Sequence, residues 1–351
     1  MSWLTELARP EIVALEAYSF AAWEPQLVRL HANELPWRAP GDETRAGLNR
    51  YPEPQPRALI ERLAALYAVP AERLLVARGS DEAIDLLIRA FCRAGRDAVL
   101  VCPPTFGMYA VAARIQGAAV HAVPLRAQDD FALDEQAVLR SCSAEVKIVF
   151  LCSPNNPTGN LLDFASILRI ARALDGRALL VVDEAYVEFA HVESLVRHIS
   201  MHSNLCVLRT LSKAHGLAGA RCGTLIADPE IIALLKKVIA PYAITQLTLE
   251  AVLRLLEPEQ LAAVAARIAQ IRAERERLAE SVARLPGVRH VWSSAANFLL
   301  AQFADAGEAL SRARAAQLLV RDVRMHPELP EALRVTIGSH AQNQRLLQAW
   351  S

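Results

Sequence analysis

The sequence lacks the features that mark several large classes of protein. No apolar run approaches the roughly eighteen residues of a membrane helix, and the first ten residues include an acid and a proline where a signal peptide would be apolar. Among its 351 residues, 38 are basic and 38 are acidic, so no net charge favours nucleic acid or an anionic membrane as a partner. We therefore expect a cytoplasmic protein that binds neither.

Cofactor and metal signatures are also scarce. No Cys-x-x-Cys occurs, so the six scattered cysteines indicate buried, reduced thiols rather than a zinc site or a redox pair. His198 and His202 are four residues apart, but they lack the adjacent glutamate and the third ligand of a metal motif, and we expect no metal. Without a Gly-x-Gly-x-x-Gly or a Walker-type loop, a dinucleotide or ATP enzyme is disfavoured.

Short apolar, β-prone segments alternate with helical periodicity through much of the chain. The expected strands are 74–77, 98–102, 120–123, 146–152, 179–182 and 205–208. This pattern predicts an α/β fold with a mainly parallel central sheet covered on both faces. After it come a long helix at 258–285 and strands at 288–292, 298–302 and 333–337, which indicate a smaller α+β domain. We divide the chain into an N-terminal arm (1–28) that packs on the small domain or a dimer partner, a large domain (29–245) and a small domain (246–351).

Four candidate motifs follow expected strands of the large domain. Phe106 comes after 98–102, the segment Ser153-Pro-Asn-Asn-Pro-Thr-Gly159 after 146–152, Asp183-Glu-Ala-Tyr186 after 179–182 and Lys213 after 205–208. Each has an ordinary explanation, as a turn, a helix cap, a core residue or an exposed loop lysine. The carboxyl ends of parallel strands, however, meet at one edge of the sheet, where ligands of such folds bind. We therefore expect the four to form one site.

Lys213 is the candidate reactive group. A lysine just past a buried strand loses its proton more easily than a surface lysine, and a deprotonated lysine reacts with the aldehyde of pyridoxal phosphate. That cofactor also needs an acid near its ring nitrogen, for which Asp183 is the best candidate. Asn156 and Tyr186 can hydrogen-bond its ring hydroxyl, and Phe106 can cover its ring.

Two groups of residues can bind anions. Ser212, Arg221 and the helix start at Gly79-Ser80-Asp81 can hold the cofactor phosphate, because free N–H groups and the helix dipole favour an anion there; capping alone would also explain Ser80. Arg334 lies inside an apolar strand pattern and Arg321 precedes it. A buried guanidinium needs an anionic partner, which a ligand carboxylate or phosphate can supply.

Together these motifs carry a resemblance over nearly the whole chain. Arg209 to Gly223, Asn-Pro-Thr-Gly at 156–159 and Asp183 to Tyr186 resemble the fold-type I pyridoxal-phosphate-dependent aminotransferases. The segments Tyr51-Pro-Glu and Arg78 to Glu82 are most similar to the histidinol-phosphate aminotransferases. The family implies transamination between histidinol phosphate and 2-oxoglutarate. Alternatives on the same fold are an aromatic amino-acid aminotransferase and a phosphothreonine decarboxylase; a cofactor-sensing regulator without turnover is a third.

The resemblance also implies roles that spacing alone does not. It implies a homodimer with shared active sites, in which Tyr51 reaches the neighbouring subunit's cofactor phosphate. Arg334 corresponds to the arginine that holds the α-carboxylate of glutamate or 2-oxoglutarate, and Arg321, Tyr18, Asn33 and Asn156 to other substrate-binding positions. The chain departs from the family at two places, with Phe106 where many relatives carry tyrosine and His215-Gly216 where they carry an aromatic residue followed by alanine.

Overall fold

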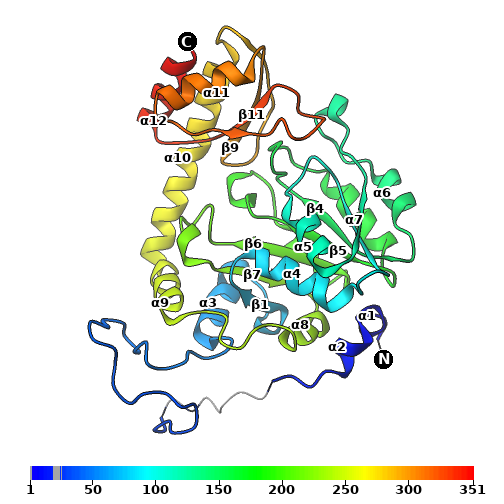
Figure 1. Cartoon of the computed structure of the whole chain (residues 1–351), viewed down its shortest axis with the longest axis vertical. Coiled ribbons are helices and arrows are strands. Elements are labelled where there is room, and N and C mark those ends of the chain that lie inside the picture. The colour runs from blue at the N-terminus through cyan, green and yellow to red at the C-terminus, as the bar shows by residue number, and fades with distance from the viewer. Residues whose placement is uncertain (1, 19–23, 25) are drawn as a thin grey trace.

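The computed structural model describes residues 2–18, 24 and 26–351 and builds them around two β-sheets (Figure 1). In the larger, seven-stranded sheet the order is β1-β7-β6-β5-β4-β2-β3, with β7 antiparallel to its neighbours and the other pairs parallel. Its strands are β1 (Leu74–Ala77), β2 (Ala98–Val101), β3 (Ala119–Ala122), β4 (Val146–Cys152), β5 (Leu179–Asp183), β6 (Leu205–Thr210) and β7 (Gly223–Ile226).

Helices cover both faces of this sheet, which confirms the expected architecture. Strands β1, β2, β5, β6 and β7 are buried along their whole length, as apolar strands between two helical layers must be. One face is packed by α3 (Arg57–Tyr67), α6 (Glu135–Ser141), α7 (Phe164–Ala173) and α9 (Gln246–Leu255), and the other by α4 (Ser80–Phe91), α5 (Met108–Gln116) and α8 (Pro229–Lys236).

All six expected strands form, with ends that agree within two residues, but β7 was not predicted. This strand has only four residues and directly follows the glycine- and alanine-rich segment after Lys213, so it offers no extended apolar pattern. It forms because it pairs with β1 on one side and β6 on the other. Its insertion places the Lys213 loop beside the start of α4.

The smaller sheet is antiparallel, with the order β10-β11-β9-β8. Its elements are α10 (Pro258–Ala283), β8 (Val288–Val291), β9 (Phe298–Phe303), α11 (Ala306–Ala315), β10 (Arg321–Asp322), β11 (Ala332–Thr336) and α12 (His340–Trp350). The expected small-domain strands are confirmed, and the long helix α10 runs beside both parts of the molecule (Figure 1). The domain boundaries at 28 and 245 stay predictions.

The N-terminal segment differs in part from the expected arm. Helices α1 (Trp3–Leu7) and α2 (Pro10–Ala14) lie on the large part of the molecule, not on the small domain, because Leu4 and Ala8 are buried in the same core as α4 and α8. The hydroxyls of Ser2 and Thr5 bond the carboxylate of Glu230 at the start of α8. Residues 1, 19–23 and 25 of the expected arm lie outside the described residues.

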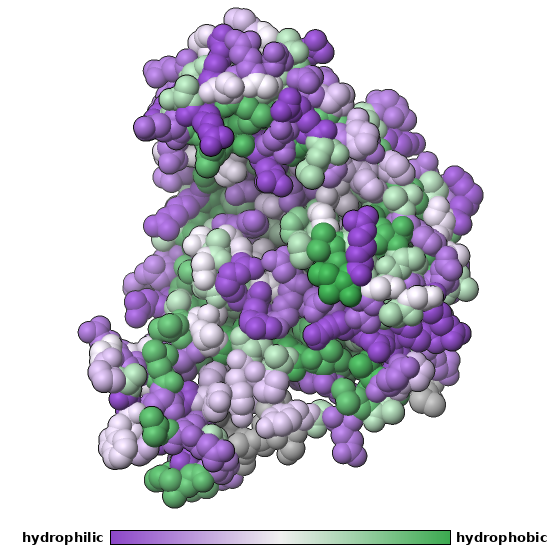
Figure 2. All heavy atoms as spheres, in the orientation of Figure 1, coloured by the Kyte–Doolittle hydropathy of each residue, from purple (hydrophilic) through white to green (hydrophobic). Residues whose placement is uncertain are grey.

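Residues 26–51 extend away from the body of the chain (Figure 1). Figure 2 shows green apolar atoms among polar ones at the lower left, where this segment lies. Leu30 of the segment is 92 % exposed, Val28 85 % and Trp37 76 %. So much exposed apolar surface is typical of a segment that packs against a partner. Among the described residues, none of the helices is both long and apolar enough to cross a membrane. All six cysteines are buried and free, as predicted.

Candidate active site

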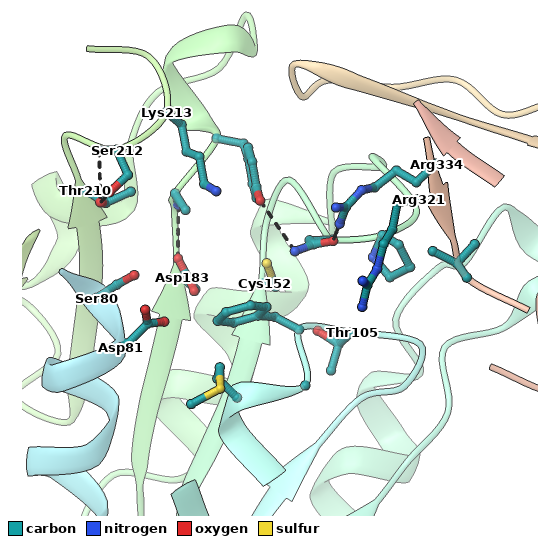
Figure 3. A pocket seen from close by; sticks show the side chains of 18 of the residues that line it. Ser80, Asp81, Thr105, Cys152, Asp183, Thr210, Ser212, Lys213, Arg321 and Arg334 are labelled. Carbon is teal, nitrogen blue, oxygen red and sulfur yellow. Dashed lines mark hydrogen bonds between the residues drawn. The ribbon is translucent and has the colours of Figure 1, made fainter. Parts of the chain in front are cut away.

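A pocket of about 560 Å³ lies at the carboxyl ends of β4, β5 and β6, facing the small sheet (Figure 3). It brings together most of the predicted site residues from segments far apart in the sequence. These are Ser80, Asp81, Phe106, Asn156, Asp183, Tyr186, Ser212, Lys213, Arg221, Arg321 and Arg334. The expectation that strand ends converge on one site is therefore met by the geometry.

Lys213 enters the pocket from the loop that follows β6. Its Nζ lies 5.6 Å from the centre of the Tyr186 ring. The side chain is open to the pocket, yet the protein around it removes enough water that burial lowers the pKa of the amine, and the Arg334 guanidinium lowers it further. The negative charge of Asp183 raises the pKa of the amine and so opposes these two effects. The amine is thus more easily deprotonated than a surface lysine.

Asp183 ends β5 and is 2 % exposed. Its carboxylate accepts hydrogen bonds from the Tyr109 hydroxyl, at 2.8 Å, and from the Ala185 amide, at 3.0 Å. Burial raises the pKa of Asp183 to about 6, although both hydrogen bonds oppose the rise. A buried carboxylate with two donors but no paired cation on the described residues is suited to a cationic ligand atom.

A chain of side chains joins the large sheet to the small one. The Asn156 amide donates to the Tyr186 hydroxyl at 3.4 Å, and the Arg334 guanidinium donates to the Asn156 side-chain oxygen. The Phe298 ring, edge-on to Tyr186, also lies 5.2 Å from the Arg334 guanidinium carbon. Three residues that sequence analysis placed in one site are therefore in direct contact.

Arg321 and Arg334 are neighbours on two adjacent strands of the small sheet. They are directly paired in the register of β10 and β11, where like charges repel. Among the described residues, Arg321 makes no ion pair, whereas its neighbour Asp322 is bonded to Arg324. Two adjacent guanidinium groups on the wall of one pocket are suited to a ligand anion.

The second anion site lies at the start of α4. Arg221 donates to the Ser212 hydroxyl at 3.3 Å and to the Asp81 carboxylate at 3.1 Å. The turn into the helix has no room for side chains, since a Cβ on Gly223 would lie 2.5 Å from the carbonyl carbon of Gly79, and one on Gly79 would lie 2.7 Å from the guanidinium of Arg221. The arginine itself has a φ of 53°, a conformation that costs energy for any residue but glycine.

Four predicted site residues do not line this pocket in the single chain. Asn33 and Tyr51 are on the extended segment, where Tyr51 is half exposed and stacks on Tyr242 with ring centres 4.6 Å apart. Tyr18 is 66 % exposed. Gly79 does not line the pocket but forms the turn that leads to Ser80.

Sequence reasoning missed Tyr109, which is fully buried and contacts Asp183 directly. Its ring also stacks on Phe150 and meets Phe106 edge to face. Helical spacing does not relate Tyr109 to Phe106, because Phe106 precedes α5 and Tyr109 lies inside it, so no sequence pattern pointed to this contact. Thr105, Cys152 and His326 line the pocket as well and were not predicted.

The residues fit pyridoxal phosphate on structural grounds. The close approach at Gly79 and Gly223 leaves main-chain N–H groups of the α4 start beside Ser212 and Arg221, as a phosphate cradle requires. Asp183 supplies the buried acid, and Lys213 supplies the amine within the same pocket. No cluster of metal-binding side chains occurs in the described part of the chain.

Comparison with known proteins shows the family of the chain. The model of the class I and II aminotransferases matches residues 26–349, and the chain belongs to that family. It is 51 % identical to the histidinol-phosphate aminotransferase of Stenotrophomonas maltophilia, an alignment that covers 98 % of this chain and 96 % of the relative.

Solved structures share the fold. The histidinol-phosphate aminotransferase of Clostridium acetobutylicum superposes with a TM-score of 0.79 at 22 % identity, covering 86 % of this chain and 90 % of that one. The enzyme of the same name from Sinorhizobium meliloti, in complex with pyridoxal-5'-phosphate, gives a TM-score of 0.76 at 24 % identity, with coverage of 86 % and 82 %.

Proposed function

We propose that this chain catalyses pyridoxal-phosphate-dependent transamination between histidinol phosphate and 2-oxoglutarate, giving imidazole acetol phosphate and glutamate in histidine biosynthesis. The observation that carries the proposal is one pocket in which an accessible lysine and a buried carboxylate lie between two separate anion sites. The identity of 51 % to a histidinol-phosphate aminotransferase supports the choice of substrate.

The anion site at α4 would hold the cofactor phosphate through the Ser80 amide, the Ser212 hydroxyl and the Arg221 guanidinium. Asp183 would hold the proton on the ring nitrogen, and Phe106 would cover the ring. When bound, pyridoxal phosphate supplies an aldehyde for the amine and a ring that withdraws electrons from the carbon beside it. Tyr186 and Asn156 would orient the ring through its hydroxyl oxygen.

Lys213 would move the proton in the chemical step. With the substrate amine bound, Lys213 Nζ would remove the proton from the substrate carbon that carries nitrogen, as a general base with a lowered pKa. At the other end of the pocket, Arg334 and Arg321 would bind the phosphate of histidinol phosphate in one half-reaction and the carboxylate of glutamate in the other.

A half-reaction assay tests the substrate. Holoenzyme is mixed separately with histidinol phosphate, phenylalanine and phosphothreonine, and the visible absorption of the bound cofactor is followed. Histidinol phosphate should cause the fastest loss of this absorption. Carbon dioxide release from phosphothreonine, or preference for phenylalanine, would instead favour one of the alternative activities.

Two variants test the residues. Lys213→Ala should lose both the absorption band and turnover, while Lys147→Ala, near the far end of β4, should keep both. Arg334→Ala should slow both half-reactions, because both use the same anion site. A variant slowed only with glutamate would contradict the shared site.

We also propose a homodimer in which the extended segment 26–51 packs on the partner and Tyr51 reaches the partner's cofactor phosphate. The large apolar exposure of that segment, and the fact that Tyr51 does not line the pocket of its own chain, support this. Mixed dimers of Tyr51→Ala and Lys213→Ala subunits provide the test. If Tyr51 acts across the interface, one site of each mixed dimer is intact and activity returns; if it acts within its own subunit, activity stays lost.

A further inference from the structure

A group of buried polar atoms lies beneath the loop that carries Lys213. Eight buried side-chain atoms make no hydrogen bond within the described residues, and five of them belong to Tyr67, Glu188, Arg209, His215 and Thr224. Buried polar atoms are rarely left unpaired, because each costs the free energy of its lost hydration. Their concentration in one place therefore needs a physical account.

Direct contacts bring these residues together. The Arg209 guanidinium donates to Glu188 Oε1 at 2.8 Å, and its central carbon lies 4.8 Å from the centre of the Tyr67 ring. Thr224 on β7 is paired with Arg209 on β6, so the two side chains are neighbours on one face of the sheet. His215 is 8 % exposed and interacts electrostatically with Glu188 and Arg209.

The unpaired atoms are complementary in chemistry. Arg209 Nε can only donate and Glu188 Oε2 can only accept. The hydroxyls of Tyr67 and Thr224 can do both, and they also interact with each other. Burial lowers the pKa of His215, so the ring is neutral and its Nδ1 can accept or donate. A buried water molecule typically makes about three hydrogen bonds to such groups.

We propose that Tyr67, Glu188, Arg209, His215 and Thr224 form a binding site for one or two internal water molecules that fasten the Lys213 loop to the sheet. Arg209 lies four residues before Lys213 and His215 lies two residues after it, so the water holds the loop on both sides. The water is a structural ligand, and the five residues position Lys213 without touching substrate. This proposed water-binding site does not depend on which amine the enzyme accepts as substrate.

The first test is a double-mutant cycle on the holoenzyme with Tyr67→Phe and Thr224→Val, which remove one hydroxyl each and keep the shape. If water bridges the hydroxyls, each substitution should raise the unfolding equilibrium constant about three- to tenfold. The second should then cost less in the presence of the first. Because the Tyr67 and Thr224 hydroxyls also interact with each other directly, ordered density in contact with the five residues in a crystal structure of the holoenzyme distinguishes bridging water from that direct contact. Trp350→Phe, which removes an indole donor to Ala309 in the small part of the molecule, should combine additively with Tyr67→Phe.

The opposite result is equally clear. If the atoms were simply unpaired, replacing each by an apolar group would be neutral or stabilising, and the two effects would add. That outcome overturns the proposal. So does a crystal structure of the holoenzyme that shows ordered water elsewhere in the interior but no density in contact with these five residues.

The second test reads the loop itself. The amide of Leu217 donates to the Leu211 carbonyl at 3.0 Å and that of Gly216 to Lys213 at 3.2 Å, so both are protected when the loop is held. In the Tyr67→Phe/Thr224→Val variant, hydrogen exchange of a peptide covering 211–217 should be about three- to tenfold faster, with α12 unchanged as the control. Unchanged exchange in the loop would refute its attachment through water.

Discussion

Asp183→Asn should make the cofactor-free protein more stable at neutral pH. The same substitution should lower the affinity of the protein for the cofactor. Burial raises the pKa of Asp183 from its ordinary 3.8 to about 6. In the unfolded chain the carboxyl ionises near 3.8, so the folded protein binds more protons than the unfolded chain between these pH values. The wild type therefore loses stability as pH rises from about 4 through about 6.

The size of the effect follows from the two pKa values. At 1.36 kcal/mol for each pKa unit, the ionised carboxylate costs the cofactor-free protein about 3 kcal/mol at pH 8, and about half of that at pH 5. The asparagine avoids this cost but can satisfy only one of the two donors, Tyr109 or the Ala185 amide, which loses about 1 kcal/mol. The variant should be about 2 kcal/mol more stable than wild type at pH 8.

The difference in stability between the variant and the wild type can be measured by urea unfolding of the cofactor-free proteins. The two proteins are compared at the same concentration and at several pH values between 5 and 8. The advantage of Asp183→Asn should grow by about 1.5 kcal/mol across this range. In parallel, its cofactor should dissociate more readily, because an amide cannot hold a proton on the ring nitrogen. A variant equally destabilised at both ends of the range would refute the view that Asp183 is costly to the empty protein and retained for its ligand.

Three further outcomes follow from the same structure. Tyr109→Phe should raise the pKa of Asp183 further, so the pH-dependent loss of stability without cofactor should extend to higher pH in urea titrations. Gly223→Ala should lower stability by about 1–3 kcal/mol and weaken the visible cofactor band, because its Cβ would collide with main chain at the start of α4; Gly219→Ala, with open space around it, should stay within about 0.5 kcal/mol of wild type. Arg209→Met should cost about 3–5 kcal/mol in thermal or urea unfolding, because it leaves buried carboxylates without their cation.

The large sheet could be predicted because its strands are apolar enough to be recognised without their neighbours. β4, apart from Lys147, and β5, apart from its final Asp183, are runs of buried apolar residues, and the motifs at their ends could be placed from that alone. β7 could not, since four residues after a loop carry little pattern and its place depends on pairing with two strands that are distant in sequence. Whether such a short strand forms depends on its pairing with neighbouring strands in the folded protein.

The candidate site likewise contains some residues that could be predicted from the sequence and others that could not. Asp183 ends β5, and Asn156 and Lys213 lie in the loops just after β4 and β6, so sheet topology brings them together. Tyr109 was missed because its role depends on how α5 packs, which brings the phenol to Asp183 across 74 positions of sequence. Tyr18, Asn33 and Tyr51 came from resemblance alone, and their assigned contacts require geometry beyond a single chain.

The contact between Arg334 and Asn156 has a consequence for how ligands enter. Only one nitrogen of the guanidinium, Nη1, donates to the Asn156 oxygen, so the other N–H groups of Arg334 stay available to an anion that binds as proposed. At Nη1 itself, binding would be an exchange of partners, and the strength of that contact would be the difference between two hydrogen bonds. Such an exchange would favour phosphate or carboxylate over an uncharged group, which only equals the amide it replaces. It would also free the Asn156 oxygen when the ligand arrives, so the amide between the two sheets would be released by the molecule it helps to select.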